Sequence, residues 1–303
     1  MTTPCGVPAA HRHRFEIRDQ LAILACGRGH PDRARPVRAQ SGHATCASYD
    51  PKIASFASTP SRVLAMQPIL ILQTGNPPRA VSERHGGFDA MVCEVAGLSP
   101  QSVDIVKVYA GERPRAPGAY RAAIITGSPA NVTDRLPWSV ESAGWIRDAM
   151  DVELPLLGIC YGHQLMADAL GGRVDYNPRG RESGTRWVGL ADAATDDPLL
   201  AGMESAFPAH FIHEQSVLEI PPGAIVLAAN AHDAHQIVRM GPRAVGVQFH
   251  PEFTAGVMRT YIEQLRDLLA GEGADVPALL DGVREAQASN SVLTHFLRTY
   301  AAR

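Results

Sequence analysis

The chain has 303 residues, of which 45% are hydrophobic and 19% are charged. This composition is that of a globular protein and excludes a collagen-like, coiled-coil or wholly disordered chain. The formal net charge of −3 gives no reason to expect nucleic-acid binding. The sequence contains no run of about 18 apolar residues, so no transmembrane helix is expected. We therefore expect neither nucleic acid nor a membrane as a partner.

The five cysteines lie far apart and form no CxxC motif. This spacing disfavours a disulfide framework or a four-cysteine zinc site, and it favours a reducing compartment. We accordingly expect the protein in the cytoplasm. The sequence also lacks a GxxxxGK[ST] motif, so no Walker-type phosphate loop is expected.

Residues 1–65 differ in composition from the rest of the chain. They hold nine basic and four acidic residues, a net charge of +5. They show neither strand alternation nor a sustained helical period, and their apolar run at 21–26 is too short for a secretory signal. Met66 is followed at once by an apolar run typical of a buried strand. We interpret residues 1–65 as a disordered extension or the result of a mis-called start.

From residue 68 onwards, predicted strands alternate with predicted helices. The strands are expected at 68–73, 103–109, 122–126, 154–159, 185–190, 224–230, 234–239 and 244–249. The helices are expected at 87–96, 138–150, 162–170, 258–269 and 291–300. This order predicts an α/β fold: a mostly parallel open sheet with helices on both faces. We expect one domain over residues 66–275, followed by a C-terminal helical segment at 276–303.

The sharpest local motif is the segment LLGICYGHQ at 156–164, in which an apolar strand runs through G-x-C-x-G into a helix. This is the thiol counterpart of the strand–nucleophile–helix elbow. Cys160 would lie at a helix N-terminus, where the helix dipole and unpaired N–H groups stabilise a thiolate. The alternative is an inert cysteine of the core. The flanking glycines favour the nucleophile.

A nucleophilic thiol needs an imidazole, and the imidazole needs a group that fixes its tautomer. His250 ends a predicted strand and is followed by Pro251 and Glu252. In an extended segment, residues i and i+2 point the same way, so His250 and Glu252 can face one site. The alternative is an incidental pair in a surface turn, which is less favoured once Cys160 is taken into account.

With these residues in hand, the chain resembles the class I, triad-type glutamine amidotransferases from about residue 68 to about residue 270. The resemblance is carried in order by ILQTG, IITGSPANV, LGICYGHQLMADALGG, FIHEQSV and VGVQFHPEF. It is strongest to the glutaminase domain of GMP synthases and to stand-alone γ-glutamyl peptide hydrolases. It implies a flavodoxin-like fold with a small antiparallel β element.

The resemblance also assigns catalytic roles. It implies that Cys160 is the nucleophile, His250 the base and Glu252 the acid that orients the base. The backbone N–H groups of Ser128 and Tyr161 would form the oxyanion hole. Ser128 stands where the family usually has the second glycine of Ser-Gly-Gly-Pro. Because serine takes a positive φ less readily than glycine, we expect the loop geometry to differ.

For substrate binding, the resemblance implies that Gln164 contacts the bound glutamine. It also implies that the segment containing His213, Glu214 and Gln215 holds the α-amino and α-carboxyl groups of the substrate, largely through its backbone. No metal and no organic cofactor is expected.

Three functions remain open at this stage. The first is hydrolysis of glutamine through a thioester by a stand-alone glutamine amidotransferase, with ammonia passed to a separate synthase subunit. We expect any synthase to be another chain because only about thirty residues follow the matched region, too few for an ATP pyrophosphatase domain. The second is hydrolysis of γ-glutamyl peptides or conjugates without a partner. The third is a non-catalytic regulatory subunit on the same fold.

Overall fold

The computed structural model describes residues 67–302, so the interpretation of residues 1–65 lies outside the described part of the chain. A nine-stranded sheet runs in the order β2-β1-β3-β4-β11-β10-β9-β6-β7, and β5 and β8 form a separate two-stranded sheet. The strand bounds are β1 Ile69–Gln73, β2 Val103–Lys107, β3 Ala122–Ile125, β4 Leu156–Ile159, β5 Arg173–Tyr176, β6 Glu182–Leu190, β7 Ala206–His213, β8 Gln215–Glu219, β9 Ile225–Ala229, β10 Ile237–Gly241 and β11 Ala244–Val247.

The large sheet has a parallel half and an antiparallel half. Strands β2, β1, β3, β4 and β11 pair in parallel. Strands β11, β10, β9, β6 and β7 then pair antiparallel. Strands β10 and β11 form a hairpin whose turn lies between Gly241 and Ala244. Strands β1, β3, β4 and β11 are short, mostly apolar runs because both of their faces are buried. The edge strand β2 contains Asp104 and Lys107 and is only partly buried.

Helices cover both faces of the sheet. Their bounds are α2 Arg79–His85, α3 Phe88–Ala96, α4 Pro137–Asp151, α5 Tyr161–Ala169, α6 Ala255–Gln264, α7 Arg266–Gly271, α8 Val276–Asp281 and α9 Gln287–Phe296. In β1, Ile69 and Ile71 pack in the core that contains residues of α3 and α9. The alternate residues Leu70 and Leu72 pack in the core that contains residues of α4 and α5. Successive side chains of the strand point to opposite faces of the sheet, so they pack in two separate cores.

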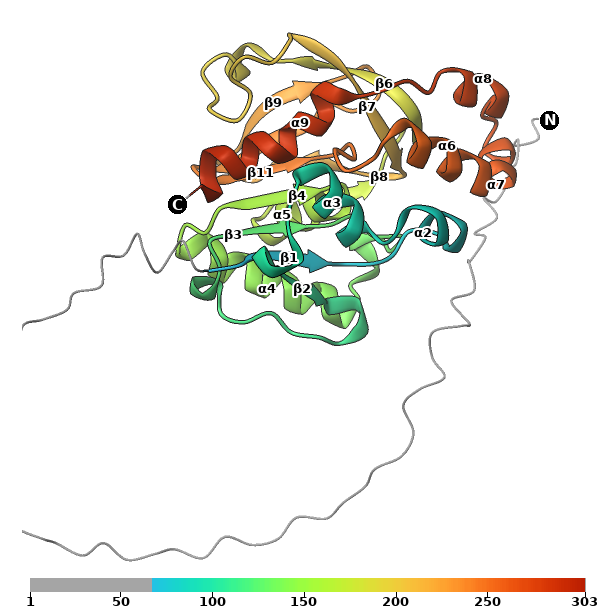
Figure 1. Cartoon of the computed structure of the whole chain (residues 1–303). Helices are drawn as coiled ribbons and strands as arrows, with labels where there is room; N and C mark the ends of the chain where they lie inside the picture. Colours follow the sequence, from blue (N-terminus) through green and yellow to red (C-terminus); the bar gives the residue numbers. More distant parts are fainter. Residues whose placement is uncertain (1–66, 303) are drawn as a thin grey trace, which may run out of the picture. The chain divides into compact units, whose positions relative to one another are not determined.

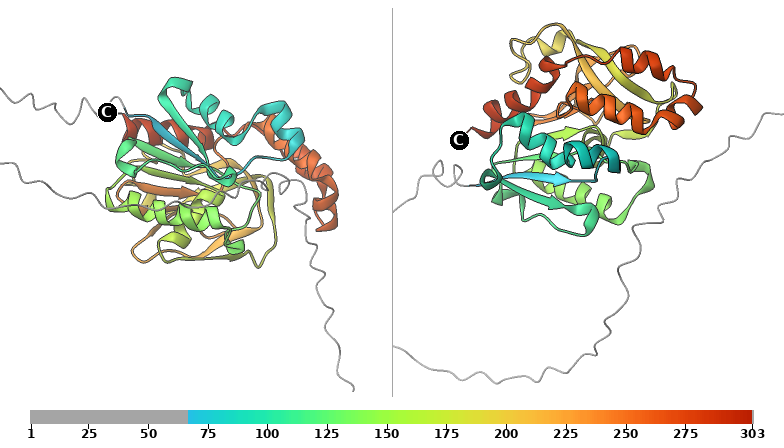
Figure 2. Two further views of the ribbon diagram at one scale, coloured as in Figure 1. Left: turned by 90° about the horizontal axis from the view of Figure 1, so that it is seen from below. Right: turned by 45° about the vertical axis from the view of Figure 1, so that its right-hand side comes forward.

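A third apolar cluster lies beside the sheet, among α2, α3, α6 and the segment after α6. Within the described residues, helices α2 and α6–α8 gather at one end and the C-terminus lies at the opposite end (Figures 1 and 2). Strand β1 points toward the end where α2 lies (Figure 1). This end is therefore the carboxyl edge of the parallel strands.

The structure corrects several element boundaries. The helix expected at 258–269 is split into α6 and α7 because Leu265 leaves the helical region, with φ −100° and ψ 14°. The strand expected at 103–109 ends at Lys107 and continues as a short 3₁₀ turn. Helix α2 and strands β5, β7 and β8 were not predicted. Helix α8 falls in the expected C-terminal helical segment but was given no bounds of its own. No helix between residues 67 and 302 is both long and apolar enough to cross a membrane.

Candidate active site

The motif residues meet at the carboxyl edge of the parallel strands. Thr74 follows β1, Gly127 and Ser128 follow β3, Cys160 follows β4, and His250 lies shortly after β11. These four strands are neighbours in the sheet. Catalytic and ligand-binding groups of open α/β sheets collect at this edge because the loops after neighbouring parallel strands converge there.

Cys160 occupies a strained turn between β4 and α5. Its backbone has φ 49° and ψ −101°, a conformation that non-glycine residues rarely adopt. Strain of this kind persists only when the surroundings enforce it. A Cβ atom at Gly158 would lie 2.6 Å from the carbonyl oxygen of Gly162, and one at Gly162 would overlap the carbonyl of Ile125. The two glycines therefore allow the close packing that holds Cys160 at the start of α5.

His250 is oriented by its neighbours in sequence. Its Nδ1 lies 2.8 Å from Oε1 of Glu252, and both side chains are buried. The ring stacks on Phe253 with a centroid distance of 4.1 Å and an interplanar angle of 14°. The Nε2 atom has no hydrogen-bond partner among the described residues. The imidazole therefore presents one nitrogen to Glu252 and keeps the other available.

Gly127 provides the space between the histidine and the cysteine. A Cβ atom at this position would lie 2.9 Å from Cε1 of His250 and 3.9 Å from Cβ of Cys160. The loop after β3 thus passes directly beside both side chains, and only a residue without a side chain fits there.

The protonation of Cys160 and His250 is coupled. Burial alone raises the pKa of the Cys160 thiol, but the facing positive charges of His250 and His213 outweigh burial and lower it. Burial alone lowers the pKa of His250, but the negative charges of Glu252 and Cys160 outweigh burial and raise it. Both shifts favour a thiolate–imidazolium pair.

Hydrogen bonds join the loop after β3 to the residue that follows β1. Oγ1 of Thr74 lies 2.9 Å from the carbonyl oxygens of Thr126 and Gly127. Oγ of Ser128 donates to the carbonyl oxygen of Thr74 at 2.8 Å and accepts from the N–H of Ala130 at 3.2 Å. Ser128 does not adopt a positive φ. The Ser128 hydroxyl holds the loop in place through these two hydrogen bonds, which a glycine at this position could not form.

The side chain of Tyr161 points away from the thiol. Its hydroxyl is 2.6 Å from Oγ of Ser139 on α4, and burial raises its pKa to about 12. Its backbone N–H belongs to the first turn of α5, where N–H groups have no intrahelical acceptor. Only the backbone of Tyr161 is therefore available to a bound group.

Three of the four predicted substrate-binding residues lie together. Nε2 of Gln164 donates to the carbonyl oxygen of Gln215 at 2.6 Å and to Oε1 of Gln248 at 3.1 Å. Nδ1 of His213 lies 2.9 Å from the same carbonyl oxygen. Glu214 faces elsewhere: its carboxylate accepts from Asn131 at 3.1 Å and from Arg181 at 2.7 Å.

Sequence reasoning missed Gly127, Phe253 and Glu182. Glu182 is buried at the start of β6 and lies 3.0 Å from Nε2 of His213. Gly127 lies inside the IITGSPANV motif and Phe253 is the last residue of VGVQFHPEF, so these two motifs were the available signal. Nothing in the local sequence around Glu182 distinguishes it from the charged residues that surround it.

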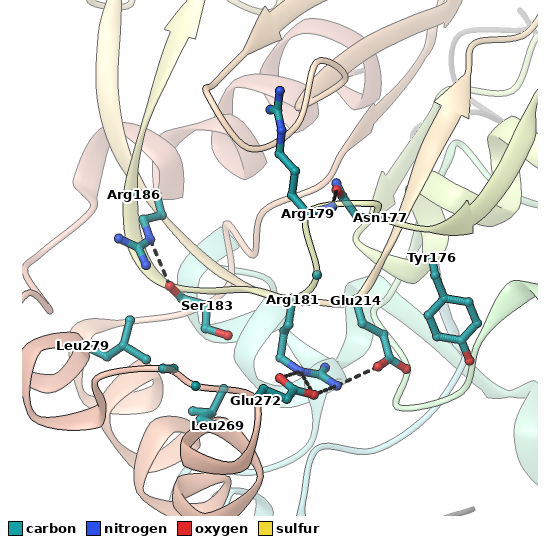
Figure 3. A pocket seen from close by; sticks show the side chains of 13 residues that line it. Tyr176, Asn177, Arg179, Arg181, Ser183, Arg186, Glu214, Leu269, Glu272 and Leu279 are labelled. Atoms are coloured by element: carbon teal, nitrogen blue, oxygen red, sulfur yellow. Dashed lines mark hydrogen bonds and ion pairs between the residues drawn. The ribbon is translucent and has the colours of Figure 1, made fainter. Parts of the chain in front are cut away.

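A cavity of about 500 Å³ opens beside Glu214. Arg181 bridges Glu214 at 2.7 Å and Glu272 at 2.9 Å across it (Figure 3). Leu279, Glu272 and other residues of its far wall come from the segment that follows α6. Among the residues that the structure describes, no cluster of His, Cys, Asp and Glu is arranged to hold a metal ion.

The chain is similar in sequence and in fold to known proteins. A family model for glutamine amidotransferase class-I matches residues 87–266. GMP synthase of Thermomicrobium roseum is 36% identical over 132 residues, which are 44% of this chain and 23% of that protein. Gamma-glutamyl peptidase 5 of Arabidopsis thaliana is 26% identical over 192 residues, 62% of this chain and 76% of that protein. A glutamine amidotransferase structure from Thermotoga maritima has a TM-score of 0.65 and 22% identity, covering 78% of this chain and 99% of that one.

The chain therefore belongs to the class I glutamine amidotransferase family. The expected family and the expected α/β, flavodoxin-like fold class, with its small antiparallel β5–β8 element, are both confirmed. The chain spans about a quarter of the length of the GMP synthases that it matches.

Proposed function

We propose that this protein hydrolyses the γ-amide of glutamine to glutamate and ammonia through a thioester on Cys160. The observation that carries the proposal is the convergence of a strained cysteine at a helix N-terminus with a histidine whose Nδ1 is held by Glu252 and whose Nε2 has no partner. This arrangement meets the requirements of an activated thiol nucleophile, a base and an orienting acid.

In the proposed reaction, the Cys160 thiolate attacks the γ-carbonyl carbon and a carbon–sulfur bond forms. The N–H groups of Ser128 and Tyr161 stabilise the oxyanion, each donor contributing about 3–4 kcal/mol by analogy with other hydrolases. The carbon–nitrogen bond then breaks as the His250 imidazolium gives its proton to the leaving ammonia. Water attacks the thioester, His250 accepts a proton from that water, and glutamate leaves with the thiolate restored.

We place the glutamine near Gln164, His213 and Gln215, whose side chains and backbone meet at one carbonyl oxygen. In this proposal the protein acts in the cytoplasm as a stand-alone amidotransferase, and its ammonia is passed to a separate synthase subunit. No metal and no organic cofactor takes part in any step.

A second candidate is hydrolysis of γ-glutamyl peptides or conjugates without a partner. One observation favours it. The match to Gamma-glutamyl peptidase 5 covers 76% of that protein, whereas the match to the GMP synthase of Thermomicrobium roseum covers 23% of that one. A non-catalytic subunit is the less favoured reading because the three triad positions keep residues able to react.

Glutamate release from purified protein tests these alternatives. We would compare L-glutamine with a γ-glutamyl dipeptide at equal concentration, using Cys160→Ala as the blank. Release from glutamine alone supports the amidotransferase, whereas faster release from the dipeptide supports the peptide hydrolase. Equal release by wild type and Cys160→Ala would contradict both and favour the non-catalytic reading.

A further inference from the structure

A second buried histidine–glutamate pair lies near Cys160. His213 at the end of β7 and Glu182 at the start of β6 are directly opposite each other in the antiparallel β6–β7 ladder. Nε2 of His213 is 3.0 Å from Oε2 of Glu182, and each side chain is only 2% exposed. The other ring nitrogen, Nδ1, is 2.9 Å from the carbonyl oxygen of Gln215. Each ring nitrogen of His213 therefore faces an oxygen.

A backbone carbonyl only accepts hydrogen bonds, so Nδ1 of His213 must carry a proton. The same holds for Nε2 if Glu182 is ionised. One carboxylate oxygen of Glu182 accepts a hydrogen bond from Nδ2 of Asn230 at 2.6 Å, and the other accepts one from Nε2 of Gln236 at 2.9 Å. Burial raises the pKa of Glu182, but its contacts with His213, Asn230 and Gln236 outweigh burial and lower it. An ionised Glu182 leaves His213 with protons on both nitrogens.

The pair is connected to the nucleophile through one shared acceptor. The carbonyl oxygen of Gln215 accepts from His213 and also from Nε2 of Gln164 at 2.6 Å. Gln164 lies one helical turn after Cys160 on α5, and its N–H bonds to the Cys160 carbonyl oxygen. The positive charge of His213 contributes to the lowered pKa of the Cys160 thiol.

Other titratable groups also face His213. They are Cys160 before α5, His163 on α5, and His232 and Asp233 between β9 and β10. Burial lowers the pKa of His163 to about 3, so this ring is neutral at physiological pH and adds no competing positive charge. The negative groups Glu182, Cys160 and Asp233 all favour a protonated His213.

We propose that Glu182 keeps His213 permanently protonated, and that this fixed imidazolium stabilises the Cys160 thiolate without itself exchanging a proton during the reaction. Glu182 is then a positioning residue that acts through His213. The inference rests on the proposed function only in taking Cys160 as the nucleophile. His250 and His213 differ in one respect: Nε2 of His250 has no partner and can transfer a proton, whereas both nitrogens of His213 are already bound.

The test is the pH dependence of Cys160 alkylation by iodoacetamide in the full chain, followed by mass spectrometry of the peptide that contains Cys160. This readout needs no substrate. We expect Glu182→Gln to move the midpoint upward by about one pH unit, so that alkylation below the midpoint is about tenfold slower. The matched control is Glu219→Gln, which removes an exposed carboxylate on β8 that forms an ion pair with Arg173. We expect the control to keep the wild-type midpoint.

The outcomes separate this inference from the proposed function. A low wild-type midpoint that Glu182→Gln leaves unchanged overturns the role of Glu182 and His213 but keeps Cys160 as an activated thiol. A wild-type midpoint at the ordinary cysteine value overturns the activated nucleophile itself.

A second measurement does not depend on the folding of a variant. In wild-type protein with ¹⁵N-labelled histidine, NMR of the ring nitrogens should show His213 with protons on both nitrogens at pH 8, where an ordinary histidine is neutral. A neutral His213 ring with one bare nitrogen would overturn the proposal.

Discussion

At the residue scale, Cys160 and His250 shift each other's protonation in opposite directions. Because the pKa of the thiol is lowered, the thiolate should form below the ordinary cysteine value of about 8.5. Because the pKa of His250 is raised, the imidazolium should persist above the ordinary histidine value of about 6.5. We predict that kcat/KM rises with pH as the Cys160 thiol loses its proton and falls at higher pH as the His250 imidazolium loses its proton. The two apparent values belong to the pair.

This profile is measured as glutamate release across a pH series at low substrate concentration. A rate that is still rising through pH 9 would show that the thiol is not activated, and would contradict the electrostatic account of the site.

Gly127 gives a second prediction at this scale. Gly127→Ala would place a methyl group 2.9 Å from Cε1 of His250, so the ring must move away from its position beside Cys160. Misplacement of a catalytic group by about 1 Å costs roughly 10²-fold in rate, and we expect kcat to fall by about that factor with the fold retained. Steady-state kinetics and a thermal melt check this together. Unchanged kcat would mean that the loop does not constrain the histidine.

The sequence predicts some site residues and not others for a physical reason. Cys160, His250 and Glu252 lie in short segments whose local pattern, a strand end followed by a tight turn, already specifies how they are presented. Glu182 becomes a site residue only through the β6–β7 pairing that places it opposite His213, 31 residues away. A contact of that kind depends on strand register, which no local pattern of residues displays.

At the element scale, the β4–α5 elbow depends on close backbone packing. Gly162→Ala would drive a Cβ atom into the carbonyl of Ile125 on β3. The better helix propensity of alanine is worth about 1 kcal/mol, whereas overpacking costs typically about 1–3 kcal/mol and more against rigid backbone. We therefore predict net destabilisation and a lower Tm.

The matched control for the elbow is Gly271→Ala at the end of α7, where nothing lies within 4 Å of the added atom. Differential scanning calorimetry of both variants decides the matter. If both melt like the wild type, the elbow is not closely packed.

Element prediction from the sequence succeeded where burial is complete. Strands β1, β3, β4 and β11 are short and buried throughout, so continuous apolar runs identified them. Helix α8 is only six residues long and has little apolar periodicity to detect. The break between α6 and α7 at Leu265 carries neither glycine nor proline, and tertiary packing rather than local sequence places it.

At the scale of the whole molecule, buried neutral histidines link stability to acid. Burial and the nearby His250 lower the pKa of His210 to about 4, whereas an unfolded histidine titrates near 6.5. The unfolded state therefore binds more protons below about pH 6.5, and stability is lost as pH falls toward the folded value. We predict that the protonation of His210 on unfolding lowers the free energy of unfolding by roughly 2 kcal/mol between pH 7 and pH 4.5.

To test this, the free energy of unfolding in urea is measured at pH 7 and pH 4.5 for the wild type and for His210→Asn. The variant should lose about 2 kcal/mol less on acidification, whatever its stability at pH 7. An identical loss in the two proteins would show that His210 does not titrate on unfolding.

The central claim for the whole molecule is a glutamyl thioester on Cys160. The most direct measurement is rapid acid quenching of the protein during turnover of radiolabelled glutamine, followed by mapping of the label. The account predicts label on the peptide that contains Cys160, release of that label by hydroxylamine, and neither label nor turnover in Cys160→Ala. Turnover that persists in Cys160→Ala, or label that maps to another residue, would contradict it.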